Sequence, residues 1–166
     1  MFKFQNTINK INILTFLLVI LVFLFDRLSK VKIINYVLKD GNNNIYINDY
    51  LNLDLVWNRG IGFGLLDMES GILYHLLSFL ILLIIFVLIY IITKSNNIDK
   101  FLYSMILGGA LGNFYDRVIY YSVPDFIDIH YNNFHWFTFN IADIFISLGI
   151  ILILLREITP KKYEKN

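Results

Sequence analysis

Four long apolar segments constrain the fold of this chain more than any other feature. They lie at about residues 11–30, 71–92, 98–121 and 139–156, and we interpret each as a helix that crosses a bilayer. Hydrophobic residues make up 57% of the chain and charged residues only 16%, a balance typical of membrane proteins. The sequence therefore predicts that residues 1–166 form one mainly α membrane domain with four transmembrane helices.

The first apolar segment resembles a signal peptide, because Lys3 and Lys10 precede it. No small-residue cleavage site follows, so we interpret it as a retained helix that extends to about Lys30. Asp26 and Lys30 are four residues apart and share a helix face. Taken alone, that spacing is typical of a surface ion pair of small energetic value.

Two polar loops, residues 31–70 and 122–138, connect these segments. In the first loop, apolar and polar residues alternate over 51–57, which predicts a half-buried strand, and Ile45 and Ile47 indicate a neighbouring strand. The glycine-rich run at 58–64 is either a structural bend or a place where a ligand approaches the backbone closely. It lacks the Gly-Lys-Ser/Thr signature of a phosphate-binding loop.

The distribution of charge predicts the orientation in the membrane. With four spans, both termini and the turn at 93–100 lie on one side, which carries a net charge of +5 against −4 on the other side. Positively charged residues favour the cytoplasmic side. We therefore expect cytoplasmic termini and two extracytoplasmic loops.

Two Asn-x-x-Asp patterns suggest a function for the outward ends of the third and fourth helices. Asn113 shares a helix face with Asp116, and Asn140 shares one with Asp143. Ionisable residues at membrane depth are costly and usually functional. Our hypothesis is an aspartyl-protease pair, Asp116 and Asp143. Helix capping and helix packing are the structural alternatives for either residue.

Other features of the sequence narrow the function. Gly108 and Gly112 form a small-x-x-x-small pair, which permits close helix packing and would help to bring the aspartates together. A net charge of +1 gives no basic field for nucleic acid, and the absence of cysteine excludes disulfides and thiolate metal sites. The second loop contains several potential zinc ligands, but the spacing of His130 and His135 fits no His-Glu-x-x-His helix, so we predict no metal site. The potential ligands are Asp125, Asp128, His130 and His135.

Four stretches of this chain together resemble the lipoprotein signal peptidase (signal peptidase II) family. They are Asp26-Arg27-Leu28-Ser29-Lys30, Asn58-Arg59-Gly60-Ile61-Gly62-Phe63-Gly64, Gly109-Ala110-Leu111-Gly112-Asn113-Phe114-Tyr115-Asp116-Arg117 and Phe139-Asn140-Ile141-Ala142-Asp143. The resemblance implies an aspartyl endopeptidase of the bacterial inner membrane that cleaves diacylglyceryl-modified prolipoproteins before the lipidated cysteine. It also implies a small extracytoplasmic β-sheet cradle around residues 40–65. The family commonly has a small residue where this chain has Ile61.

The resemblance also implies roles for particular residues. Asp116 and Asp143 would be the catalytic pair, and Asp26 and Lys30 would support the site. Five residues would contact the substrate: Asn58, Gly60, Asn113, Arg117 and Asn140. We expect a monomer that interacts with membrane lipid and with its lipidated prolipoprotein substrate, and that binds no nucleic acid.

The proposed chemistry needs no metal, nucleotide or other cofactor. Two close carboxyl groups share a proton, so one takes a proton from water and the other donates to the peptide carbonyl. Two alternatives remain, a small proton-coupled carrier and a non-enzymatic scaffold with a packed aspartate pair. The carrier would be a four-span protein without an inverted repeat, which is unusual for transporters.

Overall fold

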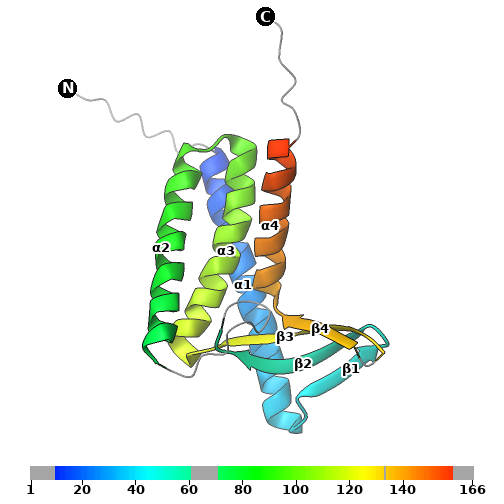
Figure 1. Ribbon diagram of the computed structural model, residues 1–166. Helices are drawn as coiled ribbons and strands as arrows, with labels where there is room; N and C mark the ends of the chain where they lie inside the picture. The colour runs from blue at the N-terminus through cyan, green and yellow to red at the C-terminus, as the bar shows by residue number, and fades with distance from the viewer. Residues whose placement is uncertain (1–9, 61–70, 133, 159–166) are drawn as a thin grey trace, which may run out of the picture.

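A computed structural model describes residues 10–60, 71–132 and 134–158 of the chain (Figure 1). The order of elements is α1 (Lys10–Asp40), β1 (Asn44–Asn48), β2 (Leu51–Asn58), α2 (Ile72–Lys94), α3 (Asn97–Tyr120), β3 (Val123–Tyr131), β4 (Phe134–Phe139) and α4 (Ile141–Ile158). The protein is therefore mainly helical with one small antiparallel sheet, as the sequence predicts. The predictions for residues 61–64 of the glycine-rich run lie outside the described residues.

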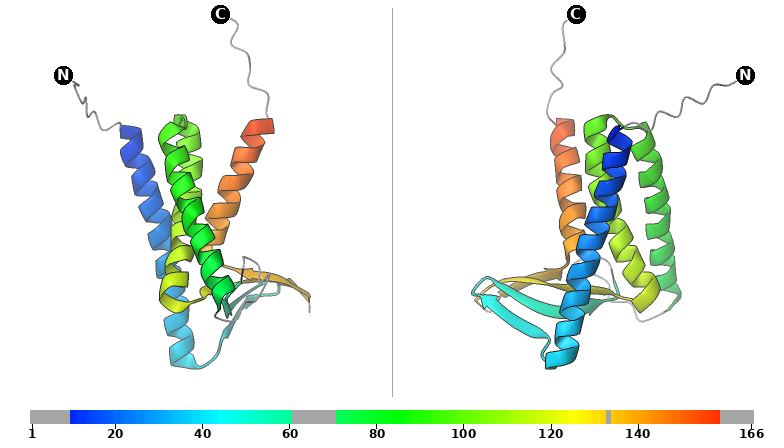
Figure 2. Two further views of the ribbon diagram at one scale, coloured as in Figure 1. Left: turned by 60° about the vertical axis from the view of Figure 1, so that its left-hand side comes forward. Right: turned by 180° about the vertical axis from the view of Figure 1, so that it is seen from behind.

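The helices form a bundle with the sheet at one end (Figures 1 and 2). Helix α3 packs against α1, α2 and α4, and the buried bundle core contains Ile85, Leu88, Ile106 and Leu107. The beginning of α1 and the end of α4 lie at the end of the bundle away from the sheet (Figure 1). By length and composition, α1 and α2 are the two described helices apolar enough to cross a membrane.

Helix α1 is longer than predicted, since it continues past Lys30 to Asp40. The assignment of residues 31–40 to a loop was therefore wrong. Ile33 is buried in a second core with Leu55 and Phe126, so this extension of α1 supports the sheet. The helix ends where Gly41, with a φ of +70°, donates its N–H to the Val37 carbonyl at 2.8 Å. A glycine in this left-handed conformation is a common helix stop.

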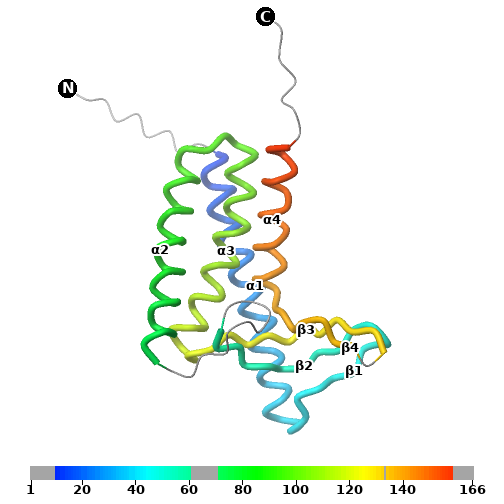
Figure 3. The backbone as a smooth tube through the Cα atoms, in the orientation of Figure 1, coloured from blue at the N-terminus to red at the C-terminus, as the bar shows by residue number. Residues whose placement is uncertain are grey.

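The sheet has the strand order β1-β2-β3-β4, with every neighbouring pair antiparallel (Figure 3). The two strands predicted in the first loop are confirmed as β1 and β2. The strands β3 and β4, which the sequence did not predict, occupy most of the second loop at 122–138. Pro124 and the buried Asp125 and Asp128 hid the strand pattern, since Pro and Asp are depleted in strands.

Glycines on α3 allow the neighbouring helices to come close. A Cβ added at Gly108 would lie 2.7 Å from the Val22 Cβ, and one at Gly112 would lie 2.5 Å from Asp26 Oδ2, so this pair packs against α1. Gly109 instead faces α4, where a Cβ would lie 2.6 Å from the carbonyl oxygen of Ala142. Close packing of the glycines is confirmed, and it brings polar side chains of α1, α3 and α4 together.

Candidate active site

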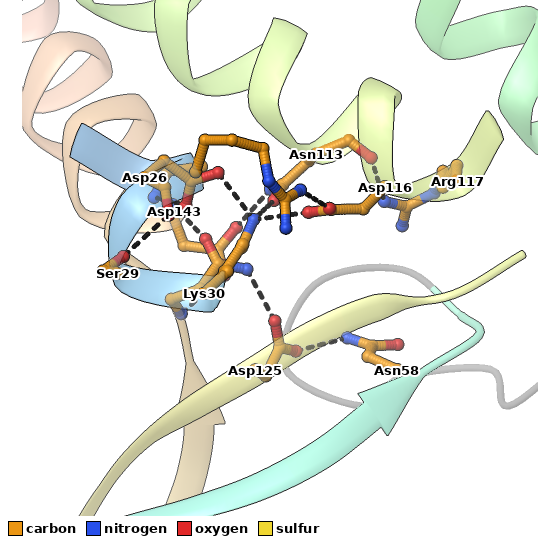
Figure 4. Close-up of polar contacts among 12 residues, drawn as sticks. Asp26, Ser29, Lys30, Asn58, Asn113, Asp116, Arg117, Asp125 and Asp143 are labelled. Carbon is orange, nitrogen blue, oxygen red and sulfur yellow. Dashed lines mark hydrogen bonds and ion pairs between the residues drawn. The ribbon is translucent and has the colours of Figure 1, made fainter. Parts of the chain in front are cut away.

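The buried ammonium group of Lys30 organises a cluster of charges between α1 and α3 (Figure 4). Lys30 Nζ donates to Asp26 Oδ2 at 2.8 Å, to Asp116 Oδ2 at 2.7 Å and to Asn113 Oδ1 at 2.9 Å. Lys30, Asp26 and Asp116 are completely buried. Asp26 and Lys30 are thus part of an internal network and do not form the surface pair that their spacing alone suggests.

A second cation binds Asp116. Arg27 donates through Nη1 to Asp116 Oδ1, and its guanidinium lies over the rings of Tyr115 and Tyr120. Both oxygens of Asp116 therefore already accept hydrogen bonds from cations. Two positive and two negative side chains balance within this cluster, as burial of charge requires. We call Asp26, Arg27, Lys30 and Asp116 the charge cluster.

Asn113 connects the charge cluster to Asp143 at the start of α4. While its Oδ1 accepts from Lys30, its Nδ2 donates to Asp143 Oδ1 at 2.8 Å. Asp143 Oδ2 also accepts the backbone N–H of Asn140 at 3.2 Å, and Asn140 Oδ1 accepts the N–H of Asp143 at 3.1 Å. This reciprocal arrangement is a capping box, which fixes the carboxyl group at the first turn of the helix.

Asp125 lies on the sheet, where two neutral amides bind it. Asn140 Nδ2 donates to Asp125 Oδ1 at 2.6 Å, and Asn58 Nδ2 donates to Asp125 Oδ2 at 2.8 Å. Burial and the nearby charge of Asp143 raise the pKa of Asp125 to about 7, against the lowering effect of the two amides. A carboxyl group with a pKa near 7 can carry or release a proton at working pH. We call Asp125, Asp143, Asn58 and Asn140 the amide cluster.

Arg117 binds the segment that directly follows β2. Its Nη2 donates to the Gly60 carbonyl at 2.7 Å, and the N–H of Gly60 donates to Asn58 Oδ1 at 2.9 Å. The carbonyl of Arg117 accepts the hydroxyl of Tyr74 at 2.9 Å. Arg117 and Gly60 thus hold the amide of Asn58 in place against Asp125.

The structure brings all the predicted site residues into one connected polar network. The motifs nominated Asp26, Lys30, Asn58, Gly60, Asn113, Asp116, Arg117, Asn140 and Asp143, and each makes at least one of the contacts described above. Sequence reasoning missed the place of Asp125, which it considered only as a zinc ligand. One signal was available, because Asp125 follows Asp116 closely in the chain. We did not use it, because no strand was predicted to place Asp125 beside the ends of the helices.

Comparison with known proteins agrees with this arrangement. The profile of the signal peptidase (SPase) II family matches residues 18–159. Lipoprotein signal peptidase of Pelagibacter ubique (strain HTCC1062) is 44% identical over 95% of this chain and 99% of its own length. The lipoprotein signal peptidase of Dichelobacter nodosus (strain VCS1703A) is 38% identical over 86% of this chain and 92% of its own.

Two solved structures share the fold, and both are described as bacterial membrane enzymes determined by the in meso method. The first, at 2.3 Å resolution, has a TM-score of 0.73 and 29% identity and covers 92% of this chain and 93% of its own. The second, at 1.9 Å, has a TM-score of 0.70 and 27% identity, with coverages of 89% and 94%.

The fold, the buried carboxyl groups and these relatives define a bacterial membrane protease of the aspartic type. The chain belongs to the signal peptidase II family. Membership of a peptidase family decides against the carrier and the scaffold that the sequence alone left open.

Proposed function

We propose that this protein removes signal peptides from diacylglyceryl-modified prolipoproteins by cleaving before the lipidated cysteine, with Asp125 and Asp143 as its reacting pair. The observation that carries the proposal is the position of buried Asp125, which accepts hydrogen bonds from the neutral amides of Asn58 and Asn140, while Asn140 also caps Asp143. Burial and the charge of Asp143 raise the pKa of Asp125 to about 7. A pair of carboxyl groups with different environments can divide the acid and base roles of peptide hydrolysis.

The sequence motifs nominated Asp116 as the partner of Asp143, and the contacts favour Asp125. Arg27 and Lys30 occupy both oxygens of Asp116, which leaves them poorly placed to accept a proton or hold a water molecule. The hydrogen bonds that Asp125 accepts from described residues come instead from the neutral amides of Asn58 and Asn140. We assign Asp116 the role of balancing the positive charges of Arg27 and Lys30.

In the proposed reaction, ionised Asp143 takes a proton from a water molecule as the water attacks the scissile carbonyl carbon. Protonated Asp125 donates its proton to the carbonyl oxygen, and the leaving amine later receives a proton from the pair. Asn113 and Asn140 orient Asp143, while Asn58, Gly60 and Arg117 position Asp125. Direct contact of these five residues with substrate stays a prediction.

An apolar groove between α1 and α3 supports the proposal that the substrate is lipidated. It has a volume of about 460 Å³ and is lined by apolar side chains that include Phe16, Phe23 and Phe114. Tyr115, which also lines it, lies beneath the guanidinium of Arg27 at the charge cluster. An acyl chain in this groove would therefore extend along the bundle from the polar site.

We propose that all four helices cross the membrane, with both termini in the cytoplasm and the sheet on the extracytoplasmic side. Helices α3 and α4 carry exposed apolar side chains such as Val118, Ile150 and Leu154, which suit contact with lipid. The charged residues of α3 and α4 lower the mean hydropathy of these helices. They lie near the helix ends or in the site, so no charge is exposed at the centre of the bilayer. We propose that the protein acts as a monomer.

The test is cleavage of a lipidated preprolipoprotein by the purified protein, beside the same substrate without lipid. We expect cleavage of the lipidated form alone, and a loss of about 10³-fold in kcat for Asp125→Asn and Asp143→Asn. Asp99→Asn is the matched control, because Asp99 is in a partly exposed pair with Arg156 far from the site.

A charge-balanced double variant separates Asp116 from Asp125. Asp116→Asn alone leaves Arg27 without its carboxylate and Lys30 with Asp26 as its remaining ion-pair partner, so it should destabilise the protein. Combining it with Arg27→Gln removes one charge of each sign, and we expect this folded double variant to keep most of the activity. If it folds and is as inactive as Asp125→Asn, the assignment of Asp125 in place of Asp116 is wrong.

A further inference from the structure

Three side chains on the β3–β4 hairpin converge outside the catalytic site. Asp128 and His130 lie on β3, and His135 lies on β4. Their potential ligand atoms all lie within 4.8 Å of one another. We propose that Asp128, His130 and His135 bind a divalent transition-metal ion of the zinc type.

The distances between the ligand atoms are close to those of a tetrahedral site. Asp128 Oδ2 lies 2.8 Å from His135 Nδ1 and 3.5 Å from His130 Nδ1. Two ligands bound to Zn²⁺ at about 2.0 Å with tetrahedral angles lie roughly 3.3 Å apart. Binding therefore requires the first pair to separate by about half an ångström, a shift that a side-chain rotation can supply.

An unsatisfied nitrogen independently points to a ligand. The His130 side chain is only 9% exposed, and its Nδ1 is buried without a hydrogen-bond partner among the described residues. A buried polar atom of this kind is costly unless something binds it. A hydrogen bond to Asp128 accounts for the position of the His135 ring, but it leaves Nδ1 of His130 without a partner. A metal ion would bind both rings and the carboxylate.

The strand register explains how the fold assembles this group. His130 and His135 are direct cross-strand partners, and their rings stack with centroids 5.1 Å apart. On the other side of β3, Asn52 of β2 pairs with Asp128, and the buried Oδ1 of Asn52 also has no hydrogen-bond partner in the described structure. Cross-strand partners share a sheet face, so this oxygen is a candidate fourth ligand.

The ligand chemistry selects the metal. Two imidazoles and one carboxylate suit Zn²⁺, Co²⁺ or Ni²⁺, whereas Mg²⁺ and Ca²⁺ prefer oxygen ligands. A bound ion would cross-link β3 and β4, the strands that carry Asp125 and lead into Asn140. The role would be structural, and binding of the ion does not depend on the proposed peptidase reaction.

The test uses the full-length protein in detergent, purified without a histidine tag and treated with a chelator. Co²⁺ is titrated while its visible absorption is recorded, and Zn²⁺ is then added as a competitor. We expect one Co²⁺ per chain, displacement by Zn²⁺ and a rise in the thermal unfolding temperature with either ion. No Co²⁺ binding by the wild-type protein overturns the proposal.

Variants locate the site, and the chain supplies a matched control because it has only three histidines. His135 is 55% exposed, so His135→Ala should fold, and we expect it to weaken Co²⁺ binding by more than about tenfold, as His130→Ala and Asp128→Asn should. His75→Ala, which changes the remaining histidine on α2, should bind as the wild type does. Unchanged affinity in folded His135→Ala, or an equal loss in His75→Ala, contradicts the site.

Discussion

The charge cluster and the amide cluster bury carboxyl groups by different means. In the charge cluster, Lys30 and Arg27 hold Asp116 through ion pairs between α1 and α3. In the amide cluster, neutral asparagines bind Asp125 next to Asp143, and the pKa of Asp125 rises to about 7. A carboxylate fixed by cations holds helices together, whereas one held by amides stays able to exchange a proton.

Asn113 joins the two clusters, because it accepts from Lys30 and donates to Asp143. The charge cluster thus positions Asp143, the proposed reacting group on α4, through a neutral amide. Substitutions in the charge cluster should therefore lower stability first, and substitutions in the amide cluster should lower activity first.

Lys30→Met should have the largest effect on stability. The substitution leaves Asp26 and Asp116 buried without their shared cation, and breaking such a network costs about 3–5 kcal/mol. Thermal unfolding in detergent measures the effect. Lys32→Met, on the exposed side of the same helix, is the control and should be nearly neutral. A Lys30→Met protein as stable as this control would contradict the structural role of the cluster.

Gly112→Ala should have the next largest effect on stability. The new Cβ would lie 2.5 Å from Asp26 Oδ2, so α1 and α3 must move apart or Asp26 must shift. Overpacking of this kind costs about 1–3 kcal/mol. The expected result is a lower unfolding temperature with the pH dependence of activity unchanged. An altered pH profile would mean that the two clusters are less separate than the contacts indicate.

The pH dependence of activity tests the amide cluster. If Asp125 is the acid, it must be protonated, and its pKa of about 7 predicts that kcat/KM falls roughly tenfold per pH unit above that value. The raised pKa also means that proton binding stabilises the folded state, and this stabilisation is lost as the pH rises from about 4 to about 7. A rate that is level from about pH 7 to about pH 9 would exclude Asp125 as the acid.

Much of the site could be predicted because helical spacing is a local property. The Asn-x-x-Asp patterns placed Asn113 beside Asp116 and Asn140 beside Asp143, and the structure connects all four through Lys30 or by capping. The alternation in β2 was likewise visible in a short window of sequence.

The rest depended on contacts between distant segments. Asp125 and His130 belong to β3, whose register is set by pairing with β2 and β4 and not by its own composition. Helical spacing rules cannot describe the His130–His135 pair, because those residues meet across a hairpin. The extension of α1 was missed for a similar reason, since Ile33 is buried by Leu55 and Phe126 of the sheet.

Asn58→Ala should have the smallest effect on activity. It tests most sharply whether the hydrogen bond from Asn58 lowers or raises the pKa of Asp125. The Asn58 amide donates to Asp125 Oδ2 and lowers the pKa of Asp125, so its removal should raise that pKa further. The loss of one neutral hydrogen bond corresponds to a shift of about one pH unit or less. The falling limb of the pH profile should therefore move to higher pH, and Asn48→Ala, at the exposed end of β1, should leave it in place. A limb that moves to lower pH would show that Asn58 stabilises the protonated form of Asp125, contrary to the direction of its hydrogen bond.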